Sequence, residues 1–154
     1  MNPIEPTPTL PSALIADDND DNRNIFRIVL ENAGFQVSEV HDGEQTIQAL
    51  EKQAYMLLLL DLQMPNVNGR SVLHWLRAQT TPTHRRMQVI VITANPHWVT
   101  DEIDTLADYV MQKPIPIVSF SQFVTRIKGD ILAVPPNSPE KPPASGDAII
   151  SVSE

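Results

Sequence analysis

Two short runs of consecutive apolar residues constrain the fold of this chain more than any other feature. They are Tyr55–Leu60 and Val89–Ile92, each of strand length and neither long enough to span a membrane. A strand that is apolar at every position needs cover on both faces, as in parallel sheets, whereas strands with one solvated face alternate apolar and polar residues. The two runs therefore predict a sheet with helices on both sides.

Strand-like and helix-like segments alternate around these runs. Strands are predicted over Ser12–Ala16, Gln36–Val40, Tyr55–Leu60, Gln88–Thr93 and Asp108–Gln112. Helices are predicted over Asn24–Ala33, Gly43–Gln53, Gly69–Gln79, Pro96–Leu106 and a last segment that carries Phe120 to Ile131. In the first helix we expect Ile25, Ile28, Val29 and Ala33 to form the buried face. Strict alternation of this kind predicts an α/β fold, a doubly wound parallel sheet of five strands with helices on both faces.

Proline marks the two ends of the chain. Four of the 14 prolines lie in residues 1–11 and five in residues 135–143, and neither segment has apolar periodicity. We therefore expect a flexible proline-rich arm over 1–11, a domain over 12–131 and a disordered proline-rich tail over 132–154. The apolar stretch Ala148–Val152 is an alternative docking segment within that tail.

Composition excludes several classes of protein. The net charge of −8 leaves no basic patch to neutralise phosphates, so we expect no nucleic-acid partner. No run reaches the length of a membrane span and the amino terminus has no secretory signal pattern, so we expect no membrane partner. Cysteine is absent, which excludes disulfides and thiolate metal sites and is typical of a reducing compartment. The expected location is the cytoplasm.

Chemically active residues follow the predicted strands. Asp17 and Asp18 follow the first strand and Asp61 the third, while Thr93 ends the fourth and Lys113 follows the fifth. The carboxyl ends of parallel strands share one edge of the sheet, where the active sites of such folds lie. Each residue alone has an ordinary structural explanation, such as helix capping, a turn or packing. Their order along the chain favours a functional cluster instead.

A cluster of carboxylates, a hydroxyl and an ammonium group suits phosphoryl transfer to a carboxylate. Neighbouring carboxylates repel one another and favour a bound hard cation such as Mg²⁺, which prefers oxygen ligands. The cation and Lys113 would neutralise charge on the phosphoryl oxygens, and Thr93 offers a hydroxyl to one of them. Asp61 is then the candidate nucleophile, forming an acyl phosphate.

At this point the sequence resembles the response-regulator receiver family. The most specific part is Leu57–Gly69, LLLLDLQMPNVNG, and similar parts are LIADDNDDNRNIF, VIVITAN and YVMQKPI. The resemblance covers about Ala13 to Ile131 and implies a flavodoxin-like fold with strand order 2-1-3-4-5. It implies a two-component signalling protein that is phosphorylated on Asp61 by a histidine kinase or phosphotransfer protein. The phosphorylated protein would then bind a downstream protein target, and a homodimer on activation is one possible form.

The resemblance also implies roles for single residues. Asp18 and Asp61 would bind Mg²⁺ by their side chains, Gln63 by its backbone carbonyl and Asp17 through water. Thr93 and Lys113 would contact the phosphoryl group, and the Lys113–Pro114 bond is often cis in this family. The protein would catalyse its own phosphorylation and dephosphorylation only, without being a conventional enzyme.

Three features depart from the family pattern. Val110 stands where many members have an aromatic switch residue, with Tyr109 one position earlier. Thr93 and Lys113 are only 20 positions apart, so we expect a shortened or irregular fourth helix around Trp98–Leu106. No effector domain is expected after the last helix.

Two other functions stay open. Asp18-Asn19-Asp20 matches the Asp-x-Asp motif of haloacid-dehalogenase-like phosphatases, although the acidic pair that this family needs after its lysine is missing. The chain is alternatively an interaction module that works without phosphorylation. Binding of Mg²⁺ and of a phosphoryl mimic separates these possibilities.

Overall fold

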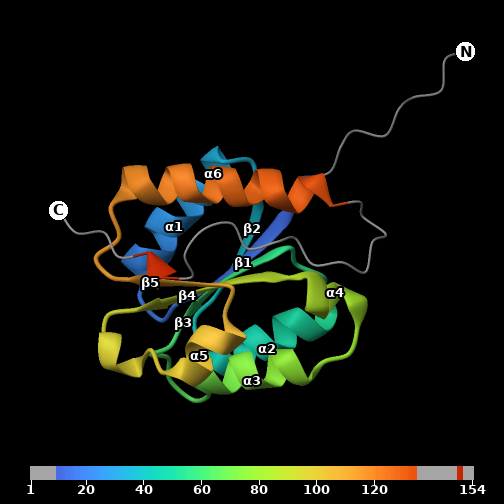
Figure 1. Cartoon of the computed structure of the whole chain (residues 1–154), viewed down its shortest axis with the longest axis vertical. Helices are drawn as coiled ribbons and strands as arrows, with labels where there is room; N and C mark the ends of the chain where they lie inside the picture. Colours follow the sequence, from blue (N-terminus) through green and yellow to red (C-terminus); the bar gives the residue numbers. More distant parts are fainter. Residues whose placement is uncertain (1–9, 135–148, 151–154) are drawn as a thin grey trace, which may run out of the picture.

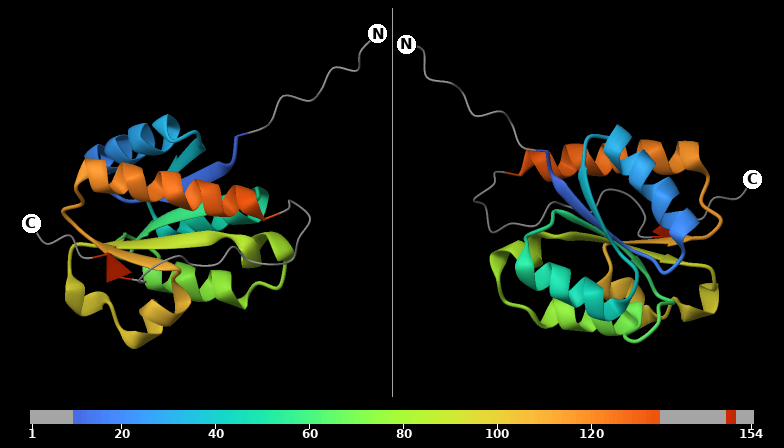
Figure 2. Two further views of the ribbon diagram at one scale, coloured as in Figure 1. Left: turned by 45° about the horizontal axis from the view of Figure 1, so that its top comes forward. Right: turned by 180° about the vertical axis from the view of Figure 1, so that it is seen from behind.

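The protein is a three-layer sandwich, seen in a computed structural model that describes residues 10–134 and 149–150 (Figure 1). A parallel sheet forms the middle layer. Helices α1 (Asp20–Asn32) and α6 (Ile117–Ala133) cover one face, and α2 (Gly43–Lys52), α3 (Gly69–Ala78) and α5 (Asp101–Leu106) cover the other (Figure 2). Within the described residues, no helix has the length and apolar character needed to cross a membrane.

The sheet has the predicted strand order. Its five main strands are β1 (Ser12–Ala16), β2 (Gln36–Val40), β3 (Leu57–Asp61), β4 (Gln88–Thr93) and β5 (Tyr109–Gln112). They pair in parallel in the order 2-1-3-4-5, which confirms the predicted fold class. Every residue of β3 and β4 is buried, as expected for strands covered on both faces.

The sheet continues beyond β5 by a two-residue strand, β6 (Ile149–Ile150). Ile149 pairs with Val110 and Ile150 with Met111, both in parallel. The rest of the predicted arm and tail, residues 1–9, 135–148 and 151–154, lies outside the described residues, so their disorder stays a prediction. Helix α6 ends at Ala133, two residues beyond the predicted domain end at Ile131. The apolar periodicity stops at Ile131 because that is the last residue of this helix that is buried.

The first helix differs from the prediction in its start and in its buried face. It begins at Asp20 because the Asn19 side chain accepts a hydrogen bond from the Asn22 amide and caps the helix. Its buried residues are Phe26, Val29 and Leu30, whereas Ile25 and Ile28 are 42% and 47% exposed. Both candidate faces are apolar. Phe26 occupies the core position because its ring packs edge-to-face on Phe120 of α6.

The chain between β3 and β5 also contains more separate helical elements than predicted. A short helix, α4 (Pro82–Arg86), precedes β4 and has too few apolar residues to show in the sequence pattern. The predicted helix over Pro96–Leu106 is a 3-10 turn, η1 (Pro96–Trp98), followed by α5, whose cap is the Thr100 hydroxyl. This irregular fourth helix agrees with the short spacing between Thr93 and Lys113.

Two apolar clusters, one on each face of the sheet, hold the layers together. The cluster under α1 and α6 includes Tyr109 and Phe123, which pack edge-to-face. Val110 belongs to the opposite cluster, under α2, α3 and α5. Tyr109, the aromatic residue of β5, therefore lies on the face covered by α1 and α6, and Val110 lies on the opposite face.

Candidate functional site

The strand ends bring the predicted residues to one edge of the sheet. Asp17 directly follows β1, and its amide donates to the Val40 carbonyl at the end of β2, 3.2 Å away. Asp61 is the last residue of β3, and both carboxylates are buried. Because β1 and β3 are direct neighbours in the sheet, their ends place the two carboxylates side by side.

Three carboxylates form the centre of the site. Oxygen atoms of Asp17, Asp18 and Asp61 lie within 4.8 Å of one another, with Asp18 exposed and the other two buried. Asp18 lies on the solvent side because it starts the turn into α1, where the Asn19 amide turns back to donate to Asp17 Oδ1, 2.9 Å away. Such a set of hard oxygen donors, open on one side, fits an octahedral cation that keeps part of its water shell.

Lys113 reaches this centre from the edge of the sheet. Its Nζ donates to Asp17 Oδ2 at 3.0 Å and lies 3.4 Å from Asp61 Oδ2. Its backbone amide donates to the Thr93 carbonyl at 2.9 Å, and the following bond to Pro114 is cis, as the family resemblance led us to expect. The ammonium group is thus held between two buried carboxylates that would otherwise repel each other.

Burial raises the pKa of Asp61 above its ordinary value of 3.8. Repulsion from Asp17 acts in the same direction, while the Gln63 amide, which donates to Asp61 Oδ1 at 3.0 Å, and the ammonium of Lys113 oppose it. The surroundings of Asp61 therefore disfavour its charged form even with Lys113 in place. A bound divalent cation would favour the charged form and so lower this pKa.

Thr93 is buried at the end of β4 but does not bond to the carboxylates. Its hydroxyl accepts from the Asn95 amide and donates to the Asn95 carbonyl, both at 3.1 Å. The hydroxyl thereby closes the turn between β4 and η1. It can donate to an incoming group only if its bond to the Asn95 carbonyl is given up.

The loop after Asp61, residues 62–68, is held by a close backbone contact at Gly69 and by a side-chain hydrogen bond from Asn66. A Cβ atom on Gly69 would lie 2.2 Å from the Asp61 carbonyl oxygen, so only glycine allows α3 to start there. Asn66 has a φ of 67° and donates from Nδ2 to Asp42 Oδ2 at 3.1 Å. Gln63 lies in this loop, so its position depends on both contacts.

Sequence reasoning missed the part played by Asp42. This carboxylate caps α2 by accepting from the Gln45 amide at 2.7 Å and also binds Asn66. Its pKa is lowered chiefly by the hydrogen bond from Gln45, with Asn66 adding to the effect. An aspartate before a glycine at a helix start signals the cap, but the partner 24 residues away has no signal in the sequence.

Comparison with known proteins agrees with this geometry. The sequence profile of the family described as "Response regulator receiver domain" matches residues 13–125. The sensory/regulatory protein RpfC of Xanthomonas campestris pv. campestris is 35% identical over 82 residues, which are 53% of this chain and 11% of RpfC. This chain thus matches only a small part of that relative.

Solved structures share the fold over most of the chain. The CheY-like receiver domain from Methylobacillus flagellatus is 26% identical with a TM-score of 0.69, and covers 77% of this chain and 98% of that chain. The receiver domain of the sensor histidine kinase PA1611 from Pseudomonas aeruginosa PAO1 has a magnesium ion coordinated in its active site cleft. It is 27% identical with a TM-score of 0.67, and the match covers 77% of this chain and 98% of the PA1611 receiver domain.

The strand order, the acidic site at the carboxyl edge of the sheet and the profile match over most of the sequence all point to one family. The chain belongs to the response regulator receiver domains of two-component signal transduction.

Proposed function

We propose that Asp61 accepts a phosphoryl group from a phosphohistidine of a histidine kinase or phosphotransfer protein. The observation that carries this proposal is the position of Lys113, whose Nζ lies 3.0 Å from Asp17 and 3.4 Å from Asp61, beside three clustered carboxylates. A buried carboxylate beside one ammonium and two further carboxylates is arranged for a nucleophile that must receive an anionic group.

Mg²⁺ is the proposed cofactor. Asp18 and Asp61 would hold it by their side chains, Gln63 by its backbone carbonyl and Asp17 through water. When bound, the ion neutralises charge on the phosphoryl oxygens. The magnesium ion in the cleft of the PA1611 receiver domain supports this assignment.

In the proposed reaction an Asp61 oxygen attacks phosphorus, the P–N bond to histidine breaks, and the histidine leaves with the electron pair of that bond. Lys113 would pair with the phosphoryl oxygens, and Thr93 would give up its bond to the Asn95 carbonyl and donate to one of these oxygens. Attack by water on the same phosphorus later returns Asp61 and inorganic phosphate. The chain therefore catalyses only its own phosphorylation and dephosphorylation.

The other two functions receive less support from the geometry. Asp20, the second aspartate of the phosphatase-like motif, has a side chain that is 88% exposed and pairs with Arg23 instead of joining the cluster. An interaction module without phosphotransfer has no need of Lys113 between two buried carboxylates. We further propose the cytoplasm as the compartment, since a chain without cysteine suits a reducing environment.

Intact mass and peptide mapping after incubation with acetyl phosphate and Mg²⁺ test the proposal. We expect one phosphoryl adduct on Asp61, lost with Asp61→Asn and without Mg²⁺. Asp21→Asn is the matched control, because Asp21 lies in the first turn of α1 outside the carboxylate cluster and should leave labelling unchanged. An adduct on another residue, or no adduct together with no binding of Mg²⁺ and beryllofluoride, would refute the receiver mechanism.

A further inference from the structure

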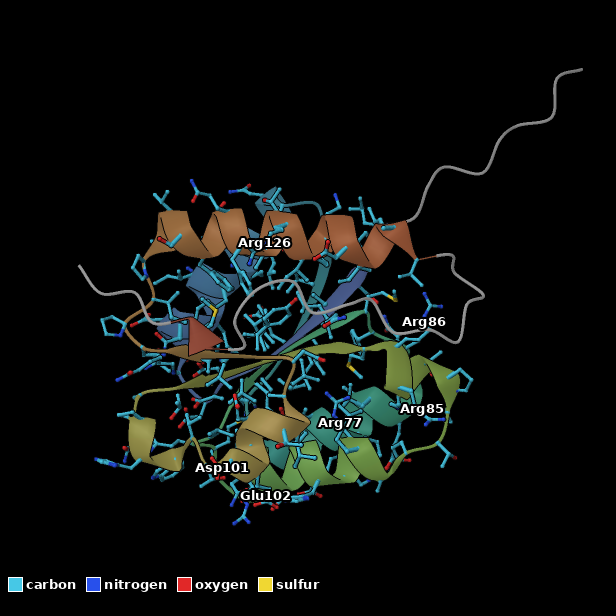
Figure 3. All side chains as sticks on the ribbon, viewed as in Figure 1. Arg77, Arg85, Arg86, Asp101, Glu102 and Arg126 are labelled. Atoms are coloured by element: carbon cyan, nitrogen blue, oxygen red, sulfur yellow. The ribbon has the colours of Figure 1, made fainter. Side chains whose placement is uncertain are left out.

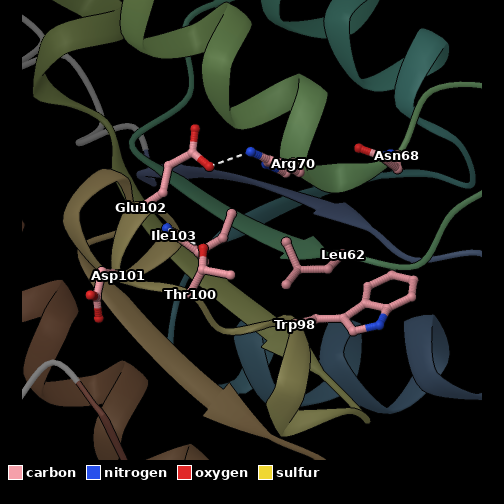
Figure 4. A pocket seen from close by; sticks show the side chains of 8 residues that line it. All are labelled: Leu62, Asn68, Arg70, Trp98, Thr100, Asp101, Glu102 and Ile103. Carbon is pink, nitrogen blue, oxygen red and sulfur yellow. Dashed lines mark hydrogen bonds and ion pairs between the residues drawn. The ribbon is translucent and has the colours of Figure 1, made fainter.

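The outer edge of β5 is where the sheet of the five main strands ends. Both faces of this strand are covered, because Val110 lies in the apolar cluster that contains Ile103 of α5 and α6 covers the opposite face (Figure 2). The ion pair between Arg70 and Glu102 ties α5 to α3 and so holds α5 on the face of the sheet (Figure 4). The backbone groups along the outer edge of β5 therefore need a partner other than these helices.

The two edges of this five-stranded sheet differ in charge. At the opposite edge, β2 carries Glu39, whose carboxylate lies 3.8 Å from the Arg23 guanidinium and 3.9 Å from that of Arg27. Charges on an edge strand oppose the addition of a strand from another chain. The residues of β5, Tyr-Val-Met-Gln, include no charged side chain. This edge therefore lacks the protection that the β2 edge has.

The charged residues on either side of β5 do not protect its edge, because both are bonded toward the interior of the sheet. The Asp108 carboxylate accepts from the Val89 amide of β4 at 2.8 Å. Lys113 Nζ donates to Asp17 Oδ2 at 3.0 Å. Neither charge is directed outward, so a strand that approaches β5 from outside meets an apolar edge.

Two arginines from the neighbouring helices are also engaged elsewhere (Figure 3). Arg77 of α3 donates from Nε to the Leu106 carbonyl at 2.7 Å. The guanidinium of Arg126 of α6 lies over the ring of Phe123, 5.2 Å from the ring centroid. These contacts hold both positive charges on the helices and leave the edge of β5 without them.

The chain itself supplies a partner for this edge, the two-residue strand β6 (Figure 1). Ile149 pairs with Val110 and Ile150 with Met111, both in parallel. The sequence singles this segment out, because residues 135–148 contain no valine, leucine, isoleucine, methionine or aromatic residue. Isoleucine is β-branched and favours strands. The first strongly apolar residues after α6 are thus the ones that cover β5.

The connection is long enough for β6 to reach β5 of the same chain. The end of α6 lies beside Ser12 and Met56, at the start of β1 and β3. From β3 to β6 the sheet crosses three strand spacings, about 15 Å. A chain the length of residues 135–148 spans about 45–50 Å when extended. Pairing within one chain therefore needs no second copy.

We propose that Ile149 and Ile150 form a detachable cover over a strand-addition site at the outer edge of β5. The site takes an extended, apolar, β-branched segment that runs parallel to β5 and binds through main-chain hydrogen bonds. With β6 in place, no strand of a second copy can pair there. Two residue pairs hold β6 whereas four hold β5 to β4, so the cover detaches before the rest of the sheet opens. This cover works without phosphotransfer.

The double substitution Ile149→Pro/Ile150→Pro in the full chain removes the cover. Amides of neighbouring residues in a strand face opposite sides, so one of these two amides faces β5, and proline has no amide hydrogen to donate. Ile149→Val/Ile150→Val is the matched control, because it keeps both amides and the β-branched side chains. Urea unfolding of both variants checks that the domain stays folded.

Amide hydrogen exchange at Val110 and Met111 measures the cover. At one of these two residues we expect exchange to be about tenfold faster or more in the proline variant and unchanged in the valine variant. A synthetic peptide of residues 146–154 should slow exchange in the proline variant again, whereas a scrambled peptide should not. In sedimentation experiments the proline variant should associate at a lower protein concentration than the parent, because its apolar edge is open.

Four results would overturn the proposal. Equal exchange in the parent and the proline variant would show that β6 does not protect β5, and equal association would show that it excludes no second copy. A peptide that restores no protection would rule out a strand-addition site. Protection in the parent that rises with protein concentration would make the β6 segment of a second copy the occupant.

Discussion

Replacement of Asp42 by alanine tests how the loop after Asp61 is held in place. Asp42 joins two elements, because one oxygen caps α2 through the Gln45 amide and the other binds the Asn66 side chain. The backbones approach closely at the same point, since a Cβ atom on Gly43 would lie 1.9 Å from the Val67 carbonyl oxygen. Alanine at position 42 removes both hydrogen bonds and leaves the backbone contact.

The expected loss of stability follows from these two bonds. Loss of a helix cap costs about 0.5–2 kcal/mol. The bond to Asn66 adds about 1 kcal/mol or less, because Asn66 is exposed and water replaces its partner. We therefore expect the free energy of unfolding to fall by about 0.5–3 kcal/mol. With a urea m-value of about 2 kcal/mol/M, the urea midpoint should fall by about 0.3–1.5 M.

Asp42→Asn is the matched control. Asparagine caps a helix about as well as aspartate, so most of the stability should remain at neutral pH. The variants should also differ in their response to acid. The folded pKa of Asp42 lies below its ordinary value of 3.8, so its ionisation stabilises the fold above that pH and this contribution disappears as the pH falls through the folded pKa. Asp42→Asn lacks this contribution at every pH.

Urea unfolding at pH 7, with equal m-values as a check on two-state behaviour, measures the effect. Calorimetric titration with Mg²⁺ measures the consequence for the site, since Gln63 lies in the loop that Asn66 anchors. We expect Asp42→Ala to bind Mg²⁺ more weakly than the parent protein. An unchanged midpoint for Asp42→Ala, or an asparagine variant as unstable as the alanine variant, would refute the view that the cap and the Asn66 bond hold this loop.

Two further substitutions test the site itself. Because the folded pKa of Asp61 is raised, ionisation of this carboxylate lowers the stability of the fold. With Mg²⁺ chelated, Asp61→Asn should have the same free energy of unfolding as the parent protein below pH 3.8 and a higher one as the pH rises through the folded pKa. Equal urea midpoints at pH 7 would contradict this expectation. Gly69→Ala forces a methyl group within 2.2 Å of the Asp61 carbonyl oxygen and 2.8 Å of the Leu62 Cα atom, so it should cost about 1–3 kcal/mol and slow labelling by acetyl phosphate. Its control is Gly129→Ala in α6, where an added Cβ atom would meet nothing within 4 Å. Alanine there should stabilise the helix by about 0.5–1 kcal/mol in the same urea experiment. A Gly69→Ala protein as stable as the parent would show that the loop is free to shift.

Residue patterns along the chain were sufficient to predict the sheet. Leu57–Leu60 and Val89–Ile92 are apolar without interruption because β3 and β4 are covered on both faces, and that burial is written into consecutive residues. The order of Asp17, Asp61, Thr93 and Lys113 along the chain was likewise sufficient to predict the site. Once the strands are parallel, residues that end them must share one edge of the sheet, whatever the loops between them do.

Features that depend on contacts between distant segments were decided only by the tertiary structure. Ile25 and Phe26 are equally acceptable in an apolar helix face, and the choice between them depends on Phe120, 94 positions further along the chain. The break between η1 and α5 and the bond from Asn66 to Asp42 likewise depend on partners that no local pattern contains. The hydrophobic effect acts on side chains, so burial is visible in the periodicity of apolar residues along the chain. The distances of 3.0 Å and 3.4 Å from Lys113 to Asp17 and Asp61 are set only by the packing of the folded sheet.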